Sequence, residues 1–325
     1  MISTVSAPGK LMLFGEHAVV YDRHCLVTAV GQRLHLQAEQ ITSSDLEIDA
    51  VDTGVTGYKK PILQIGKGEI PKGVKFVEFA IRNFSLQYPI KTGIRIKTKS
   101  EFSPKLGFGS SSAAAVCTVK ALSELFDRKL SNDEIFTIAY KTVLDIQGKG
   151  SGYDVAAAVY GGTLYYLTGG KEIMQLDVEE IPLIVGYTGV KADTTTLVEE
   201  VSKKAEIYGD IIEQIYNNCE TLVLRAKESL EKKDWKSVGE LMDFNQGYLE
   251  ALGVSSPKLS TMIYAARAAG AYGAKLSGAG GGDCMIAIAN EKKITRVAEA
   301  LKDVSEEVPE VATGVAGVRL EEKML

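Results

Sequence analysis

The spacing of apolar positions changes along the chain and divides it into parts. Short β-branched or alternating runs dominate residues 1–100 and predict strands at Ile2–Ser6, Leu11–Phe14, Leu26–Val30, Leu34–Ala38 and Gly93–Thr98. Pro8-Gly9 predicts a turn between the first two of these strands. One amphipathic helix is expected near Val74–Tyr88, and residues 50–72 predict a loop or a hairpin.

Residues 101–165 change to a helical pattern between glycine-rich segments. Ala113–Phe126 is rich in alanine and predicts a helix directly after the loop 107–112. Ser131 and Glu134 have the spacing of a capping box and predict a second helix. This part ends with GKGSGYDVAAAVYGG at 148–162 and a strand at Thr163–Leu167.

A second lobe is expected after Gly169-Gly170. It begins with a buried strand at Leu183–Tyr187 and continues with helices near 195–208, 210–231, 235–251 and 257–270. The glycine-rich segment KLSGAGGGD (275–283) then leads to a strand at Cys284–Ala289, a helix at 291–303 and a final strand. The whole pattern predicts an α+β fold with two lobes, 1–168 and 169–325, that meet at glycine-rich loops.

Composition and charge argue against several classes of protein. The 325 residues carry a net charge of −5 without a long basic run, which argues against nucleic-acid binding. No apolar run approaches the roughly 20 residues of a membrane span, and the N-terminus lacks the features of a signal peptide. We therefore expect a cytoplasmic protein without a membrane partner. The four dispersed cysteines and three histidines argue against a structural zinc site.

The loop Gly107-Phe108-Gly109-Ser110-Ser111-Ser112 is the first segment that suggests chemistry. Glycines let backbone N–H groups approach a phosphate, and the following helix adds its own free N–H groups and dipole. The serine hydroxyls can donate to phosphate oxygens or ligate Mg²⁺. The alternative is a serine-capped helix after an ordinary loop. The Walker pattern, Gly-Lys followed by Ser or Thr, is absent from the sequence.

Three further segments place charged or small residues where a site would need them. Lys10 alternates with apolar residues, and a lysine that points inward from a strand is costly unless it meets an anion. Asp154 either caps a short helix or accepts a proton in a cleft. Glu16-His17 is equally compatible with an exposed pair. The four glycines within 278–282 favour close approach of a ligand or of another backbone.

The stretches APGKLMLFGEHAVV, LGFGSSSAAAV and KLSGAGGGDC, in this order, resemble the three motifs of the GHMP kinase superfamily. VGYTGVKADTTTLVEEV and MDFNQGYLEALGVSSPKL resemble the archaeal branch that phosphorylates mevalonate. The resemblance implies an N-terminal β-sheet lobe of the ribosomal-protein-S5-like type, packed against a ferredoxin-like C-terminal lobe. It also implies that ATP binds between the lobes and phosphorylates the C5 hydroxyl of mevalonate to 5-phosphomevalonate, in isoprenoid synthesis.

The resemblance further implies roles for individual residues. Asp154 would accept the substrate proton, Lys10 would keep Asp154 ionised, and Ser111 would ligate Mg²⁺. ATP would be bound by Lys105, Leu106, Gly107, Phe108, Gly109, Ser110, Ser111 and Ser112. The substrate would be bound by Glu16, His17, Ser151, Gly152, Ser277, Gly278, Ala279 and Gly280.

Departures from the family pattern leave alternatives open. Val143 occupies the position where the family usually has a glutamate that helps to bind Mg²⁺, and Asp145 would lie on another face of the helix. Asp283 replaces a further glycine, and GSGYDVAAAVYGG resembles kinases of 5-phosphomevalonate. That substrate would need extra cations, for which the candidates are Lys105, Lys149 and Lys191. A non-catalytic sensor that keeps the cleft is another alternative, and the family leaves a homodimer open.

Overall fold

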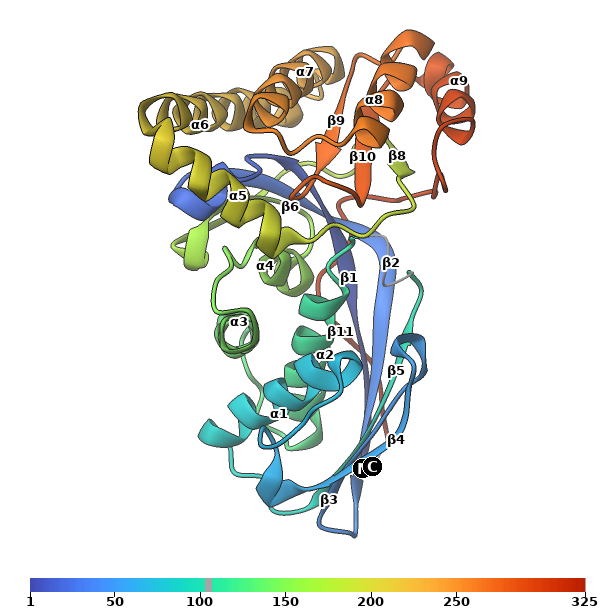
Figure 1. Cartoon of the computed structure of the whole chain (residues 1–325). Helices are drawn as coiled ribbons and strands as arrows, with labels where there is room; N and C mark the ends of the chain where they lie inside the picture. Colours follow the sequence, from blue (N-terminus) through green and yellow to red (C-terminus); the bar gives the residue numbers. More distant parts are fainter. Residues whose placement is uncertain (103–106, 325) are drawn as a thin grey trace.

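The computed structural model describes residues 1–102 and 107–324, which form a large and a small β-sheet with helices packed on both. Figure 1 shows the small sheet and its helices stacked on one end of the large sheet. This mixture of helices and strands confirms the predicted α+β fold.

The large sheet runs through most of the N-terminal half. Within the described residues it has eight strands, in the order β11-β1-β2-β5-β3-β4, with β6 paired to β2 and to β7. The strands are β1 (Ile2–Phe14), β2 (His24–Ile41), β3 (Asp45–Ala50), β4 (Val55–Pro61), β5 (Gly93–Ser100), β6 (Thr163–Leu167), β7 (Glu172–Leu176) and β11 (Arg319–Met324). The sheet is antiparallel except where β3 pairs with β5.

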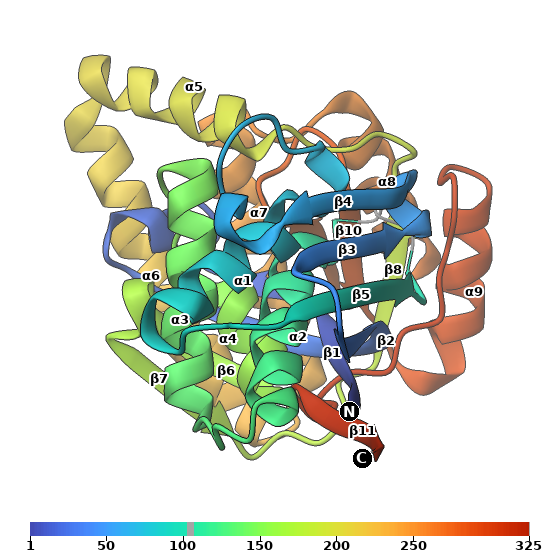
Figure 2. The same cartoon turned by 90° about the horizontal axis from the view of Figure 1, so that it is seen from below.

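Four helices cover one face of the large sheet, as Figure 2 shows. They are α1 (Lys75–Gln87), α2 (Ser110–Leu125), α3 (Asn132–Gln147) and α4 (Tyr153–Tyr160). The core of this part lies between these helices and the sheet. α2 packs directly on β1 and β2, so the loop that precedes α2 lies close to β1.

The small sheet is antiparallel, with the order β8-β10-β9. Its strands are β8 (Leu183–Tyr187), β9 (Gly273–Ser277) and β10 (Cys284–Ile288). The helices of this part are α5 (Thr194–Ile207), α6 (Gly209–Glu231), α7 (Trp235–Leu252), α8 (Pro257–Ala269) and α9 (Glu291–Lys302). A second buried cluster lies between them and the sheet.

The predicted turn at Pro8-Gly9 is wrong, because β1 continues through it. The two residues mark only a shift of register, where Pro8 pairs with Arg33 and Gly9 pairs with Val30. The partner strand β2 accommodates the extra residues between them, and a bulge is a place where a strand tolerates proline. The strands predicted at Ile2–Ser6 and Leu11–Phe14 are therefore one long strand, β1. Those predicted at Leu26–Val30 and Leu34–Ala38 are likewise one strand, β2.

The helices agree with the sequence pattern, but some strands do not. Every predicted helix is present to within about one turn, and Ser131 with Glu134 forms the predicted capping box of α3. Residues 50–72, predicted as a loop or a hairpin, hold the single strand β4, which forms a hairpin with β3 before it. Strands β3, β7 and β9 were not predicted. Asp45–Ala50 alternates buried apolar residues with acidic ones, so this signal was present in the sequence.

Two segments beyond residue 168 belong to the large sheet. β7 pairs with β6, and β11 pairs with β1 at the end of the chain. The chain therefore leaves the large sheet, forms the smaller one and returns, and the division at 168/169 stays a prediction. No helix in the described ranges is both long and apolar enough to serve as a membrane span.

Replacing either of two glycines of α7 by alanine should change the stability of the protein, in opposite directions. A Cβ on Gly239 would lie 2.5 Å from the Cβ of Tyr272, because α7 packs closely on the start of β9, whereas a Cβ on Gly247 would meet nothing within 4 Å. We expect Gly239→Ala to lower the free energy of unfolding by about 1–3 kcal/mol. Gly247→Ala should raise it by roughly 0.5–1 kcal/mol. Urea unfolding of both variants measures this, and equal effects would contradict the packing described.

Candidate active site

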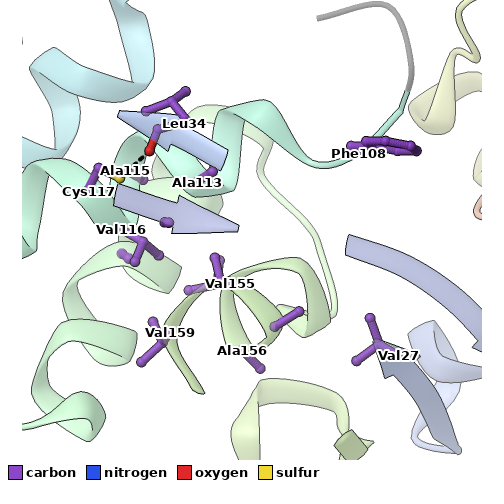
Figure 3. Close-up of a cluster of buried hydrophobic side chains, with 14 of the residues drawn as sticks. Val27, Leu34, Phe108, Ala113, Ala115, Val116, Cys117, Val155, Ala156 and Val159 are labelled. Atoms are coloured by element: carbon purple, nitrogen blue, oxygen red, sulfur yellow. Dashed lines mark hydrogen bonds between the residues drawn. The ribbon is translucent and has the colours of Figure 1, made fainter. Parts of the chain in front are cut away.

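Two helices begin at one place, and small side chains hold them together. The N-caps of α2 and α4 are Gly109 (φ 80°) and Gly152 (φ 90°), and no side chain caps either helix. The alternatives in which Ser110–Ser112 or Asp154 serve as caps are therefore wrong. Figure 3 shows small apolar side chains packed along both helices, among them Ala113, Ala115, Val116, Val155, Ala156 and Val159. Two helix N-termini with uncapped N–H groups favour an anion.

Lys10 joins β1 to both of these helix starts. Its Nζ lies 3.2 Å from Oδ1 of Asp154 and donates to the carbonyl of Gly107 at 3.1 Å. Its backbone N–H donates to the carbonyl of Phe108 at 3.0 Å. Burial would lower the pKa of Lys10, but the nearby carboxylates, above all Asp154, outweigh it and raise the pKa. The inward-facing lysine thus meets an anion and stays charged.

A cavity of about 170 Å³ opens beside Asp154, and we call it the Asp154 cavity. Its polar lining includes Glu16, His17, Ser112, Lys149, Ser151, Asp154, Thr194 and Thr195. Its apolar lining includes Met12, Val19, Val20, Val143, Val155 and Val198. A small molecule that carries both hydroxyls and an apolar group would match this lining.

His17 lines the Asp154 cavity with a neutral ring. Its Nε2 lies 2.9 Å from the carbonyl of Ala279, so Nε2 carries the proton and donates it. Burial lowers the pKa of His17, and the ring is therefore neutral at pH 7. Its Nδ1 is buried and has no hydrogen-bond partner among the described residues.

Glu16 is held by a buried ion pair that no motif predicted. The Nζ of Lys275, on β9, donates to Oε1 of Glu16, and both side chains are fully buried. Burial raises the pKa of Glu16 and lowers that of Lys275, and each residue opposes the shift of the other. The backbone N–H groups of Glu16 and Gly278 also act on this carboxylate and lower its pKa. The pair ties the segment after β1 to the small sheet.

A second cavity, of about 350 Å³, lies on the other side of the start of α2, and we call it the Ser111 cavity. Its lining includes Ser110, Ser111, Asp52, Thr53, Lys72, Phe76, Thr98 and Lys191. Oδ2 of Asp52 accepts from the backbone N–H of Ser100 at 2.7 Å, which fixes one wall. Because Ser111 lines this cavity and Ser112 lines the other, the start of α2 separates the two.

Most of the residues expected to bind substrate lie together, and a few do not. Glu16, His17, Ser151, Gly152, Gly278 and Ala279 line the Asp154 cavity. Ser277 and Gly280 do not line it. The Ser277 hydroxyl bonds both the N–H and the C=O of Met12, at 3.0 and 2.9 Å. Gly280 lies against the carbonyl of Val254. This is the close backbone approach that its glycine-rich segment predicted.

Only some of the residues expected to bind ATP have side chains that line a cavity. Ser110 and Ser111 line the Ser111 cavity. The Phe108 ring is buried in the core against Phe102, so only its backbone faces the loop. The expected contacts from Lys105 and Leu106 lie outside the described residues.

Sequence reasoning missed the part of the site that comes from α5. Thr194, Thr195 and Val198 line the Asp154 cavity, although α5 is distant along the chain. The signal was a helix start, since Asp193 caps α5 through the N–H of Thr196 at 3.1 Å. A cap identifies where a helix begins but not what the helix points toward.

The structure also shows where Val143, which stands in place of the family's glutamate, lies. Val143 lines the Asp154 cavity, as the family pattern implies for that position. Asp145 faces elsewhere, where it accepts from Asn83 at 3.0 Å and pairs with Lys141 at 2.8 Å. Asp145 therefore does not replace the glutamate. No group of three or more potential metal-binding side chains occurs in the described ranges.

Two uncapped helix starts, a lysine–aspartate pair and two adjoining cavities form a site that suits a kinase of a small molecule. The models of the GHMP kinases N terminal domain and the GHMP kinases C terminal domain match residues 75–162 and 226–307. This chain belongs to the GHMP kinase family of ATP-dependent kinases.

Several relatives within the family are mevalonate kinases. The mevalonate kinase of Pyrococcus abyssi is 38% identical, over 98% of this chain and 97% of its own. That of Methanothermobacter thermautotrophicus is 32% identical, over 88% and 90%. The crystal structure of Methanococcus jannaschii mevalonate kinase matches with a TM-score of 0.80 and 27% identity, over 99% of this chain and 98% of that one.

Removing one partner of the buried Glu16–Lys275 pair should lower the stability of the protein. We expect Lys275→Met to lower the free energy of unfolding by roughly 3–5 kcal/mol, because it leaves a buried carboxylate without its cation. Glu199→Gln is the matched control, since it breaks the exposed pair with Lys149 and should cost about 1 kcal/mol or less. Urea unfolding compares the two, and a similar small loss in both would contradict the structural role of the pair.

Proposed function

We propose that this chain transfers the γ-phosphoryl group of ATP to the C5 hydroxyl of mevalonate, forming 5-phosphomevalonate and ADP. One observation carries the proposal: consecutive residues, Ser111 and Ser112, line two different cavities. A nucleotide in the Ser111 cavity would present its phosphates at the start of α2, beside Lys10 and Asp154. A substrate in the Asp154 cavity would meet them there.

The lining of the Asp154 cavity suits mevalonate. Mevalonate carries a methyl group, two hydroxyls and one carboxylate. The valines and Met12 suit the methyl group, while the hydroxyls of Ser151 and Thr194 offer hydrogen-bond partners for the hydroxyls. Lys149 supplies a cation for the carboxylate.

The same residues support a simple phosphoryl transfer. Asp154 would orient the C5 hydroxyl and accept its proton as the hydroxyl oxygen bonds to the γ-phosphorus and the bond to ADP breaks. Lys10 would pair with the Asp154 carboxylate and offset the negative charge that spreads over the phosphoryl oxygens. The loop amides and the N-termini of α2 and α4 would hold the phosphates in line.

Magnesium fits the residues around the loop, although only in part. The oxygen donors beside the start of α2 are the hydroxyl of Ser111, in the Ser111 cavity, and the carboxylate of Asp154, in the Asp154 cavity, and hard oxygen atoms of this kind are the ligands that Mg²⁺ prefers. Since Val143 offers none, the ion would depend mainly on phosphate oxygens. When bound, Mg²⁺ neutralises charge on the ATP phosphates.

The alternative substrate, 5-phosphomevalonate, has less support. Its extra phosphate needs extra cations. Among the described residues, Lys149 is the only cationic side chain of the Asp154 cavity, and it pairs with Glu199 at 3.5 Å. Lys191 lines the Ser111 cavity instead. Streptococcus pneumoniae phosphomevalonate kinase shares the fold, with a TM-score of 0.80, but only 19% identity.

We place this reaction in the cytoplasm. All four cysteines are free and buried, as expected for a reducing compartment. The homodimer that the family leaves open stays a prediction.

Parallel assays of ADP release test the substrate. With Mg²⁺-ATP present, we expect turnover on mevalonate and little on 5-phosphomevalonate. Turnover on 5-phosphomevalonate alone would overturn the proposal and favour the alternative. Nucleotide binding without ADP release on either substrate would indicate a sensor.

Substitution of the central ion pair tests the mechanism. We expect Asp154→Asn and Lys10→Met each to lower kcat by at least about 100-fold, because the first removes the proton acceptor and the second removes its cation. Steady-state kinetics and a melting curve for each variant separate lost chemistry from lost folding. Near wild-type kcat in either folded variant would rule out these roles.

A further inference from the structure

The Ser111 cavity carries one feature that phosphate binding does not explain. Asp52 is the one carboxylate in its described lining, and a carboxylate repels the phosphates that the start of α2 attracts. We propose that Asp52 accepts a hydrogen bond from the nucleoside part of ATP, given by the 6-amino group of adenine or by a ribose hydroxyl. Asp52 would thereby set which nucleotides this kinase accepts. The inference rests on the proposed function, because it assumes that the Ser111 cavity holds the nucleotide.

Asp52 is fixed in place and keeps capacity to accept a further hydrogen bond. It lies in the short helical turn η2 (Val51–Thr53), which follows β3. Its Oδ2 accepts from the backbone N–H of Ser100, at the end of β5, at 2.7 Å. A carboxylate has about four acceptor positions, and this contact uses one of them. Because Asp52 is exposed at the wall of the cavity, its other oxygen, Oδ1, can meet a ligand.

The wall that carries Asp52 is built from two turns in close contact. The hydroxyl of Thr53 is shared between the carbonyls of Ala50, at 2.9 Å, and of Gly73, at 3.2 Å. Gly73 belongs to the turn η4 (Lys72–Val74), and a Cβ on it would lie 2.4 Å from Oγ1 of Thr53. Both turns line the cavity. Since the Thr53 hydroxyl is engaged by these carbonyls, Asp52 is the side chain of η2 that offers an acceptor to a ligand.

The rest of the lining suits the other parts of a nucleotide. Apolar side chains offer contact to a base or a sugar ring, namely Leu34, Phe76, Val77 and Ala114. Lys72 and Lys191, together with the uncapped start of α2, suit phosphates. The serine and threonine hydroxyls of the lining can donate or accept, whereas a carboxylate only accepts. Asp52 therefore selects for a donor, and the nucleoside carries its donors as amino and hydroxyl groups.

Nucleotide binding measured by calorimetry without mevalonate tests the inference, since no turnover is required. The ligands are ATP, ITP, in which an oxygen replaces the 6-amino group, and 2′-deoxy-ATP and 3′-deoxy-ATP, which each lack one ribose hydroxyl. We expect wild type to bind at least one altered nucleotide about 10-fold more weakly than ATP, because a hydrogen bond to a charged acceptor is lost. The nucleotide that loses affinity identifies the donor.

Asp52→Asn should remove this discrimination. Asparagine keeps an oxygen for the N–H of Ser100 but presents its amide N–H₂ group in place of the other oxygen. We expect the variant to bind ATP about 10-fold more weakly than wild type and to bind the discriminated nucleotide to within about two-fold of ATP. Asp49→Asn is the matched control, because Asp49 also accepts from a backbone N–H, that of Gly57 at 2.7 Å, but lines neither cavity. It should bind every nucleotide as wild type does.

The outcomes separate recognition from a structural role. Equal affinity of wild type for all of these nucleotides would overturn the inference, as would wild-type affinity for ATP in Asp52→Asn. Weakening by one common factor for every nucleotide would also overturn it, because Asp52 would then only shape the cavity. The expected binding pattern without phosphorylation of mevalonate would overturn the proposed function alone. A wild-type protein that binds no nucleotide would overturn both.

Discussion

The ion pair between Lys10 and Asp154 is the interaction on which the rest of the site depends. A lysine that faces inward from β1 is tolerated only beside an anion, and Asp154 provides that anion from the first turn of α4. The same ammonium also holds the loop through Gly107. One side chain thus brings together three segments that lie far apart in the sequence. Their meeting point is the place where two cavities adjoin.

Buried polar contacts between the two sheets complete the Asp154 cavity. Glu16 pairs with Lys275, His17 donates to Ala279, and Ser277 bonds the backbone of Met12. Each contact joins β1, or the segment after it, to β9 or the glycine-rich turn that follows. Burying two charges costs free energy of desolvation, but separating them once buried costs more, because each would be left unpaired. The pair therefore specifies one arrangement of the two parts.

The helices and the glycine-rich loops could be predicted from the sequence, because their signals are local. The capping box of Ser131 and the alanine-rich run after the loop are examples. Lys10 and Asp154 were also singled out, because a charge in an apolar pattern needs an explanation. Other features depend on contacts that no local pattern contains. β1 continues through Pro8-Gly9 because it pairs with β2 on both sides of the register shift, and Lys275 gains its role only by meeting Glu16.

The central claim is that the Ser111 cavity holds the nucleotide and the Asp154 cavity holds mevalonate, with Asp154 between them. A crystal structure with mevalonate and a non-hydrolysable ATP analogue tests it most directly. The account predicts the C5 hydroxyl within hydrogen-bond distance of the Asp154 carboxylate, on the side that faces the γ-phosphate. Mevalonate bound with its C5 hydroxyl away from Asp154, or a nucleotide bound outside the Ser111 cavity, would contradict it.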